Sequence, residues 1–202
     1  MKLEFMNKLI VVLVITMLVN VTITKAQVTS DTLAVEVKTT SYRSNHVAIG
    51  YHVNNFAHDF GYGIGLTSPY FALNTLAVRA SCNFQWFNYI DKTTTTYSMA
   101  SYQNIKVGIL SSAFILNKGA RLYGEMGAVI LVCPSTITST NISSGGYGLF
   151  GFEFFIHKGF SYFIELGAIG TKTKADNVTA IPIFSNGFTT SGGLRLYFKG
   201  KH

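Results

Sequence analysis

Three glutamates stand out among the residues that could carry out chemistry, because carboxylates held close together can act as a general acid and a general base. Glu125, Glu153 and Glu165 each lie in a segment where large apolar residues alternate with small or polar ones, on the less apolar side. Acid–base catalysis would require a carboxyl group with a shifted pKa that is open to a substrate. The sequence contains no sign of such an opening, so we favour a packing role for the three carboxylates.

Four basic residues have the same parity as the glutamates, which means that they lie on the same side of the alternating pattern. Every charge in the alternating segments from position 74 onward falls on this one side of the chain. Like charges placed next to each other in a narrow space of low dielectric constant repel unless opposite charges reach them. We therefore predict a network of ion pairs, whose members are Arg79, Lys106, Arg121, Glu125, Glu153, Glu165 and Arg195.

Residues 147–171 show most clearly which elements must position these charges. They form two stretches with a period of two, separated by Lys158-Gly159, and this pattern predicts a β-hairpin. One face is almost purely large and apolar, and the other carries the glutamates. A buried core normally excludes Glu and a solvated face excludes rows of Phe, so we assign the apolar face to lipid and the polar face to a filled lumen. The predicted lipid-facing residues are Phe150, Phe152, Phe154, Ile164, Leu166, Leu194 and Leu196.

Alternation of the same kind predicts eight strands, six of them at 46–54, 59–67, 74–87, 102–116, 121–132 and 187–198, and two within 147–171. Short breaks between them interleave with longer polar connections at 91–97, 133–145 and 174–186. Short turns on one rim and long loops on the other are typical of outer-membrane barrels, and an even strand count places both termini on the periplasmic side. The predicted fold is an all-β, eight-stranded antiparallel transmembrane barrel. Its interior would be just wide enough for side chains, so we expect it to be plugged.

The composition agrees with this class of fold. The 202 residues suffice for one domain, and 48% are hydrophobic, 14% aromatic and only 12% charged. The net charge is +7, but the basic residues are dispersed, which argues against nucleic-acid binding. Cys82 and Cys133 lack metal-ligand spacing, and we do not favour a disulfide between them. His52 and His157 are expected to be hydrogen-bonding residues at the rim or in the lumen. We predict no metal site, no cofactor and no catalytic residue.

The N-terminal segment 1–26 has the features of a secretory signal peptide. Lys2 and Lys8 precede an apolar run that is too short to cross a bilayer, and the segment closes on small residues up to Ala26. Translation could start at Met1 or at Met6, and a start at Met6 would keep only Lys8 ahead of the apolar run. We divide the chain into this signal peptide, a segment 27–45 that is either an extension or the start of the first strand, a barrel at 46–198 and a tail at 199–202.

The last strand carries a family resemblance. Gly192-Gly193-Leu194-Arg195-Leu196-Tyr197-Phe198 places apolar residues at every second position up to a terminal aromatic residue. With the signal peptide and the eight alternating segments, this pattern resembles the small outer-membrane β-barrel proteins of the OmpX/OmpA type. The resemblance implies export through the periplasm to the outer membrane of a Gram-negative bacterium, contact with lipid, and recognition of Leu194, Leu196 and Phe198 by the barrel-assembly machinery. The chain departs from the pattern by continuing to His202.

Three functions remain open from the sequence. The leading hypothesis is a monomeric, non-enzymatic barrel with a structural or surface-interaction role, whose loop partner the sequence does not identify. The second is a barrel enzyme that modifies the acyl chains of lipid A or phospholipid; its candidate residues, His46 near Ser44 and His58 near Asp59, lack the His-x-Ser spacing of the deacylases. The third is a soluble periplasmic lipid-binding barrel, which would carry its apolar face inward.

Overall fold

The computed structural model describes residues 45–56, 59–92, 94–116, 119–157, 159–179 and 186–199. The predicted signal peptide lies outside this part of the chain, and so do 27–44 and 200–202. No helix among the described residues is long and apolar enough to cross a membrane. The chain forms eight strands: β1 (His46–Phe56), β2 (Asp59–Thr67), β3 (Leu76–Ile90), β4 (Tyr97–Leu116), β5 (Ala120–Val132), β6 (Ile142–His157), β7 (Phe160–Thr171) and β8 (Gly187–Lys199).

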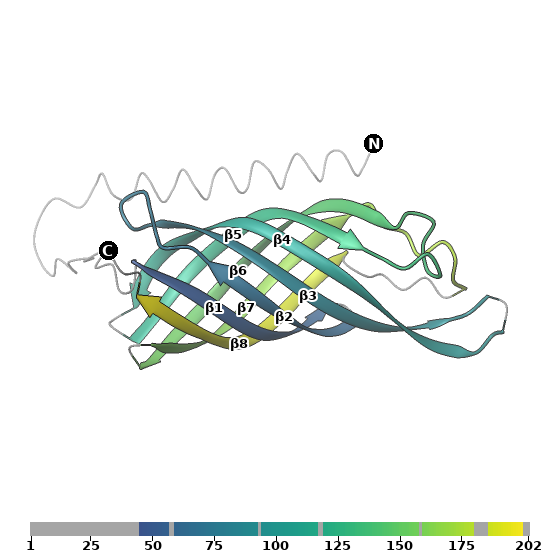
Figure 1. Cartoon of the computed structure of the whole chain (residues 1–202), viewed down its shortest axis with the longest axis horizontal. Helices are drawn as coiled ribbons and strands as arrows, with labels where there is room; N and C mark the ends of the chain where they lie inside the picture. The colour runs from purple at the N-terminus through teal and green to yellow at the C-terminus, as the bar shows by residue number, and fades with distance from the viewer. Residues whose placement is uncertain are drawn as a thin grey trace, which may run out of the picture. The chain divides into compact units, whose positions relative to one another are not determined.

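The strands close into a barrel in which each strand pairs antiparallel with its neighbours in sequence order (Figure 1). Closure is made by β1 and β8, which pair from His46 opposite Lys199 to Phe56 opposite Thr189. The predicted all-β, eight-stranded antiparallel barrel is thus confirmed. Lys199, which the sequence assigned to the tail, is the last residue of β8.

The barrel has two ends with different connections. The ends of β1 and β8 that carry His46 and Lys199 lie at the turn end, together with the connections β2–β3, β4–β5 and β6–β7. The connections β3–β4, β5–β6 and β7–β8 lie at the opposite end, which we call the loop end. The chain enters and leaves the barrel at the turn end, as the even strand count predicted.

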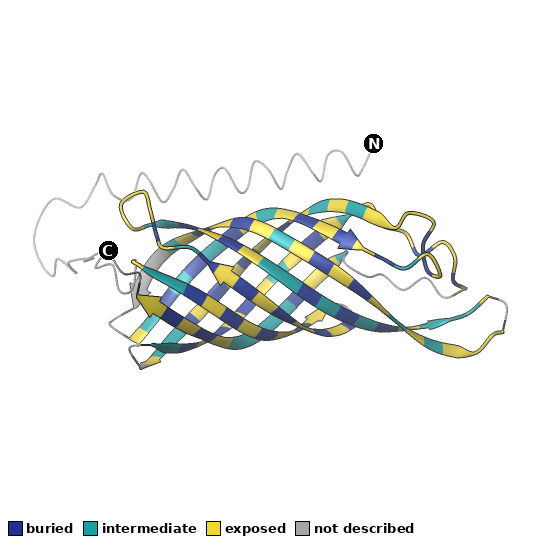
Figure 2. Ribbon diagram, viewed as in Figure 1, coloured by how far each residue is buried: buried dark blue, intermediate teal, exposed yellow. Residues whose placement is uncertain are grey.

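Alternation of side chains creates an inner and an outer face. Every second residue of β2 is buried and the residues between are exposed, and the same pattern continues around the barrel (Figure 2). The outer face carries large apolar side chains, including Ile64, Val107 and Phe150. This arrangement is the reverse of a soluble lipid-binding barrel, which would hold such side chains inside.

Three strands extend at least three residues beyond their predicted ends. β3 continues to Ile90 and β4 begins at Tyr97, so their hairpin reaches past the other strands at the loop end (Figure 1). The connection that was predicted as a long loop closes tightly, because the backbone N–H of Thr95 donates to the carbonyl oxygen of Asp91 at 3.0 Å. β6 begins at Ile142, five residues before the predicted strand, because Ser143 and Ser144 pair with β5.

Candidate functional site in the barrel lumen

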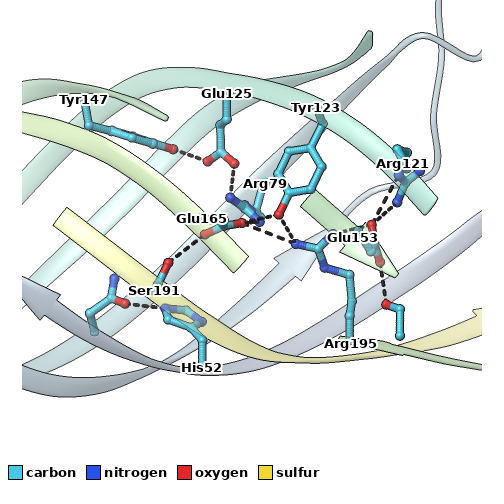
Figure 3. Close-up of polar contacts among 12 residues, drawn as sticks. His52, Arg79, Arg121, Tyr123, Glu125, Tyr147, Glu153, Glu165, Ser191 and Arg195 are labelled. Atoms are coloured by element: carbon cyan, nitrogen blue, oxygen red, sulfur yellow. Dashed lines mark hydrogen bonds and ion pairs between the residues drawn. The ribbon is translucent and has the colours of Figure 1, made fainter. Parts of the chain in front are cut away.

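Seven charged side chains from six strands point into the lumen. The arginines and glutamates among them are labelled in Figure 3. The three arginines and the three glutamates of this set are buried, and Lys106 is partly buried. Each one occupies an inward position of its strand, so strand alternation alone directs it into the barrel. The set is Arg79 on β3, Lys106 on β4, Arg121 and Glu125 on β5, Glu153 on β6, Glu165 on β7 and Arg195 on β8.

Glu165 joins cations that come from different sides of the barrel (Figure 3). Nη1 of Arg79 donates to its Oε1 at 2.6 Å, and the hydroxyl of Tyr123 donates to the same oxygen at 2.5 Å. Nη2 of Arg195 lies 3.5 Å from Oε1, and the hydroxyl of Ser191 donates to Oε2 at 3.0 Å. Both carboxylate oxygens are therefore occupied, which is a structural arrangement and not that of a free general base.

Glu125 shares Arg79 with Glu165. Nη2 of Arg79 forms an ion pair with Oε2 of Glu125, and the hydroxyl of Tyr147 donates to Oε1 at 2.5 Å. Two carboxylates on nearby strands would repel each other if no charge lay between them. The guanidinium group of Arg79 removes this repulsion because its fork can bind two carboxylates at once.

Glu153 is the centre of the network near the turn end and is 0% exposed. Arg121 donates to its Oε2 through Nη2 at 2.5 Å and Nε at 3.2 Å, and Nη1 of Arg195 donates to the same oxygen at 2.9 Å. The hydroxyls of Ser161 and Tyr197 both donate to Oε1. One buried carboxylate thus pairs with two guanidinium groups, and removing it would leave Arg121 without a carboxylate partner and Arg195 with only Glu165.

Aromatic rings cover the guanidinium groups. The guanidinium carbon of Arg195 lies 4.5 Å from the ring centroid of Phe163, and that of Arg121 lies 4.9 Å from the centroid of Tyr70. Tyr70 belongs to the β2–β3 connection, and burial raises the pKa of its hydroxyl above the ordinary value. The connection turns back through Ala72, whose φ angle is 46°, and the next two residues also have positive φ angles. This turn places Tyr70 over the network at the turn end.

Lys106 takes a different place in the lumen from the three arginines. In the described part of the chain no carboxylate lies within ion-pair distance of its amino group, although every arginine of the set has one. Its Nζ lies 5.5 Å from the ring centroid of Tyr147. The sequence predicted Lys106 as an ion-pair member because of its parity, but parity does not specify which partners come within reach.

A layer of amide side chains lies on the loop-end side of the charges. Asn83 is its centre: its Oδ1 is hydrogen-bonded to Nε2 of His52 at 2.6 Å and accepts from Nδ2 of Asn54 at 2.9 Å, and its Nδ2 donates to Asn104 at 2.6 Å. A Cβ atom added at Gly63 would approach Oδ1 of Asn83 to 2.2 Å, so a larger residue here would have to displace the Asn83 side chain. His52 is thus a lumenal hydrogen-bonding residue, as predicted, whereas the side chain of His157 lies outside the described residues.

Loops from three connections meet at the loop end and form a cap, which comprises residues 91–92, 133–141 and 172–179. Ile137 and Val178 are buried within it, next to Cys133. The backbone N–H of Asn177 donates to the carbonyl oxygen of Ile137 at 3.0 Å. Burial raises the pKa of the Cys133 thiol to about 12.

Asp176 ties two loops of the cap together. The hydroxyl of Ser139 donates to its Oδ2 at 2.5 Å, and the backbone N–H of Ser139 donates to Oδ1 at 2.9 Å. These hydrogen bonds hold the pKa of Asp176 below its ordinary value. Nζ of Lys92 donates to the backbone oxygen of Asp176 and so joins the β3–β4 connection to the same point.

The predicted lipid-facing residues lie on the outer wall. All are exposed except Phe154, whose ring stacks on Tyr162 with centroids 4.8 Å apart. Phe198 is exposed near the end of β8. Among the enzymatic candidates, His46 lies in β1 and Asp59 is buried and accepts a hydrogen bond from Tyr102 at 2.8 Å, whereas Ser44 and His58 lie outside the described residues.

The tyrosine and serine partners of the carboxylates did not emerge from the sequence. Tyr123, Tyr147 and Tyr197 share the parity of the charges in their strands, and this shared parity is the signal that could have identified them. Cys82 and Cys133 are both free, and no cluster of three His, Cys, Asp or Glu side chains among the described residues could hold a metal ion.

No protein-family model matches the chain, and no curated protein matches it by sequence. Its structure is similar to the N-terminal β-barrel domain of Pseudomonas aeruginosa OprF, with a TM-score of 0.50 and 13% identity over 76% of this chain and 98% of that chain. It also matches Yersinia pestis Ail in complex with the heparin analogue sucrose octasulfate, with a TM-score of 0.46 and 16% identity over 76% of this chain and 97% of that chain. The match to Yersinia pestis Ail in a phospholipid bilayer nanodisc has a TM-score of 0.48 and 12% identity over 76% of this chain and 99% of that chain. The chain therefore has the fold of the small eight-stranded outer-membrane β-barrels.

Proposed function

We propose that this protein is a monomeric, non-enzymatic barrel of the bacterial outer membrane, in which a closed lumen forms a rigid support for an external loop cap. One observation carries the proposal. The two faces of the same strands are segregated, with apolar side chains outside and paired charges inside. A barrel of this kind suits lipid around it and does not need a passage through it.

The outer wall supports the location in a membrane. Phe150 is 71% exposed, Ile164 50% and Leu166 43%, and all three lie on the outer face of β6 and β7. Contiguous apolar surface of this kind is rare on soluble monomers, whereas lipid is its natural surrounding.

The lumen supports a scaffold role better than a pore. Both carboxylate oxygens of Glu165 are occupied, Glu153 is fully buried, and the amide layer lies between these charges and the cap. The cavity beside the charges measures about 20 Å³, which is room for about one water molecule. We expect no steady ionic current when the purified protein is inserted into a planar bilayer. A stable open conductance would contradict the closed lumen.

A charge placed on the outer wall tests the membrane location. Arg at the middle of a lipid-facing strand costs about 2–4 kcal/mol, but only about 0–1 near the membrane interface. Leu166→Arg should therefore lower the free energy of unfolding in lipid vesicles by the larger amount. Met99→Arg, on the exposed face near the loop end of β4, is the matched control. Equal effects of the two substitutions would argue against a lipid-embedded wall.

The surface role belongs to the cap. A groove of about 430 Å³ lies between the β5–β6 and β7–β8 connections, lined by hydroxyl groups such as that of Ser139 and by Lys172 and Lys174. A photo-crosslinking residue at Lys174 in intact cells should capture extracellular or cell-surface molecules. The same residue at Lys199, at the turn end, is the control. Identical adducts from both positions would refute the assignment of the cap to the outside.

The non-enzymatic assignment has its own test. The carboxylates of Glu153 and Glu165 accept hydrogen bonds on both oxygens, and nothing in their geometry favours lipid hydrolysis. Incubation of the purified barrel with lipid A and phospholipid should leave the acyl chains unchanged by mass spectrometry. A change in acylation that follows the protein through purification would replace this proposal with the lipid-modifying one.

A further inference from the structure

The lumen holds one more cation than its ion pairs use. The arginines Arg79, Arg121 and Arg195 share the three glutamates through five ion pairs. Lys106 takes part in none of these pairs. Asp59, a further buried carboxylate, accepts a hydrogen bond from Tyr102 and forms no ion pair with another described residue. Of the four basic side chains in this set, Lys106 is therefore the one that forms no ion pair with a described residue.

Strand register places Lys106 at one end of a row of small residues. Lys106 pairs with Ser81, Ser81 with Gly65, Gly65 with Gly50, and Gly50 with Arg195. All five positions face the lumen at successive strands. Three small residues thus separate two cations and leave space between them.

The glycines of this row leave real room. A Cβ atom added at Gly65 would meet its nearest neighbour, Cβ of Ser81, at 3.5 Å, and one at Gly50 would meet nothing closer than 3.8 Å. Gly63, two residues away from Gly65, has no such room because the side chain of Asn83 fills it. The cavity of about 20 Å³ lies here, and its walls include Lys106, Arg195 and Gly65.

The walls of the cavity have a positive balance. Arg79, Lys106 and Arg195 contribute three positive charges, and Glu125 and Glu165 contribute two negative ones. The two carboxylates are already bound to Arg79. The hydroxyls of Ser81 and Thr67 also line the space. A buried charge without a partner is strongly destabilising, so a bound counter-ion would relieve the excess.

We propose that this cavity binds one small monovalent anion, chloride in a cell, with Lys106 as its counter-charge. The space admits a particle about the size of a water molecule. A monatomic halide satisfies this limit, whereas a carboxylate such as gluconate has too many heavy atoms. The site depends on the fold of the lumen and not on the surface role of the cap, so the two proposals can fail separately.

The test is the dependence of unfolding on chloride. Chloride should replace gluconate at constant ionic strength during urea unfolding in lipid vesicles, so that screening of the ion pairs stays constant. An anion that binds one site of the folded state makes the unfolding equilibrium constant fall tenfold for each tenfold rise in chloride above the dissociation constant. The wild-type barrel should show this slope, and Lys106→Met should show none. Equal slopes in the two proteins would overturn the proposal.

Two further measurements keep the result independent of the folding of Lys106→Met. Gly65→Ala places a methyl group in the cavity and should abolish the chloride dependence, whereas Gly170→Ala, where a Cβ atom would meet nothing within 4 Å, should leave it unchanged. Crystals of the wild-type barrel grown in bromide should show an anomalous peak beside Lys106. A chloride dependence that survives in Gly65→Ala, or a lumen without a bromide peak, would each refute the site.

Discussion

The lumen and the cap both link parts of the chain that are distant in sequence, but they do so through different kinds of contact. In the lumen the links are ion pairs such as that of Arg195 with Glu153, which are 2% and 0% exposed. In the cap the polar link between Ser139 and Asp176 is exposed, and most of the buried residues are apolar, among them Ile137 and Val178. Ion pairs therefore link the strands inside the lumen, whereas the cap combines an apolar centre with hydrogen bonds at its surface.

The largest effect expected from this contrast is the loss of Glu153. Breaking a buried ion pair by removing one partner costs about 3–5 kcal/mol, because a charge is left without compensation. Glu153→Ala leaves Arg121 without a carboxylate partner and Arg195 with only its longer contact to Glu165, and should lower the free energy of urea unfolding in lipid vesicles by this amount. Glu125→Ala should cost less, because Arg79 keeps Glu165. If the two variants lower the free energy of unfolding by the same amount, the way in which the arginines are shared between glutamates does not determine stability.

The cap should depend on its apolar centre. Ile137→Ala removes buried methyl groups, and such a change costs about 2–5 kcal/mol of folding stability. Because a loop can relax around the cavity, we expect a cost near the lower end of this range. Cys133 reports on the change in a Cys82→Ser background, because its buried thiol, with a pKa of about 12, reacts slowly at neutral pH. Ile137→Ala should accelerate maleimide labelling at least tenfold. Ile130→Ala on the outer wall is the control and should leave the labelling rate unchanged.

A single hydroxyl in the lumen should matter more than its size suggests. Tyr123→Phe removes a hydrogen bond to the charged Glu165, and hydrogen bonds to charged groups contribute about 1.5–3 kcal/mol. We expect the lower value, because Glu165 retains Arg79, Arg195 and Ser191. Tyr62→Phe on the outer wall should cost almost nothing under the same urea titration. A comparable cost for both tyrosines would remove the distinction between the two faces.

The smallest effect is the response of the cap to acid. The folded pKa of Asp176 lies below its ordinary value of 3.8, so its contribution is complete above pH 3.8 and is lost as the pH falls through the folded pKa. Amide hydrogen exchange of the cap should therefore lose protection in acid below this pH. Asp176→Asn should show no such pH dependence. Loss of protection at a higher pH would assign the response to a different group.

Much of the fold was predictable, because strand alternation is a local property. The parity of Glu153 or Arg195 is visible in a few neighbouring residues, and this parity alone determines which face a side chain occupies. The prediction that the glutamates approach one another also followed from the order of their strands. The structure confirms a closed eight-stranded barrel, although the strand ends at Ile90, Tyr97 and Ile142 were placed too short.

The partners within the lumen were not predictable, because they depend on register. Lys106 and Arg79 have the same parity, yet Arg79 binds two glutamates and Lys106 binds none. This outcome depends on the height of each strand relative to its neighbours, which a single strand does not encode. The cap was not predicted from the sequence for a different reason. Ile137 and Val178 are isolated apolar residues in loops rich in Ser and Thr, where no period reveals that they are buried.

The pairing of β1 with β8 also has a consequence for the order of folding. His46 and Lys199 stand at opposite ends of the described chain and become neighbours only when the circle of strands is complete. Contacts between such distant residues carry a large loop-closure cost and form slowly. Until then the first strand presents an unpaired edge that could associate with other chains. The ring therefore cannot close before its last strand is available, and a chain released without β8 would be prone to aggregation.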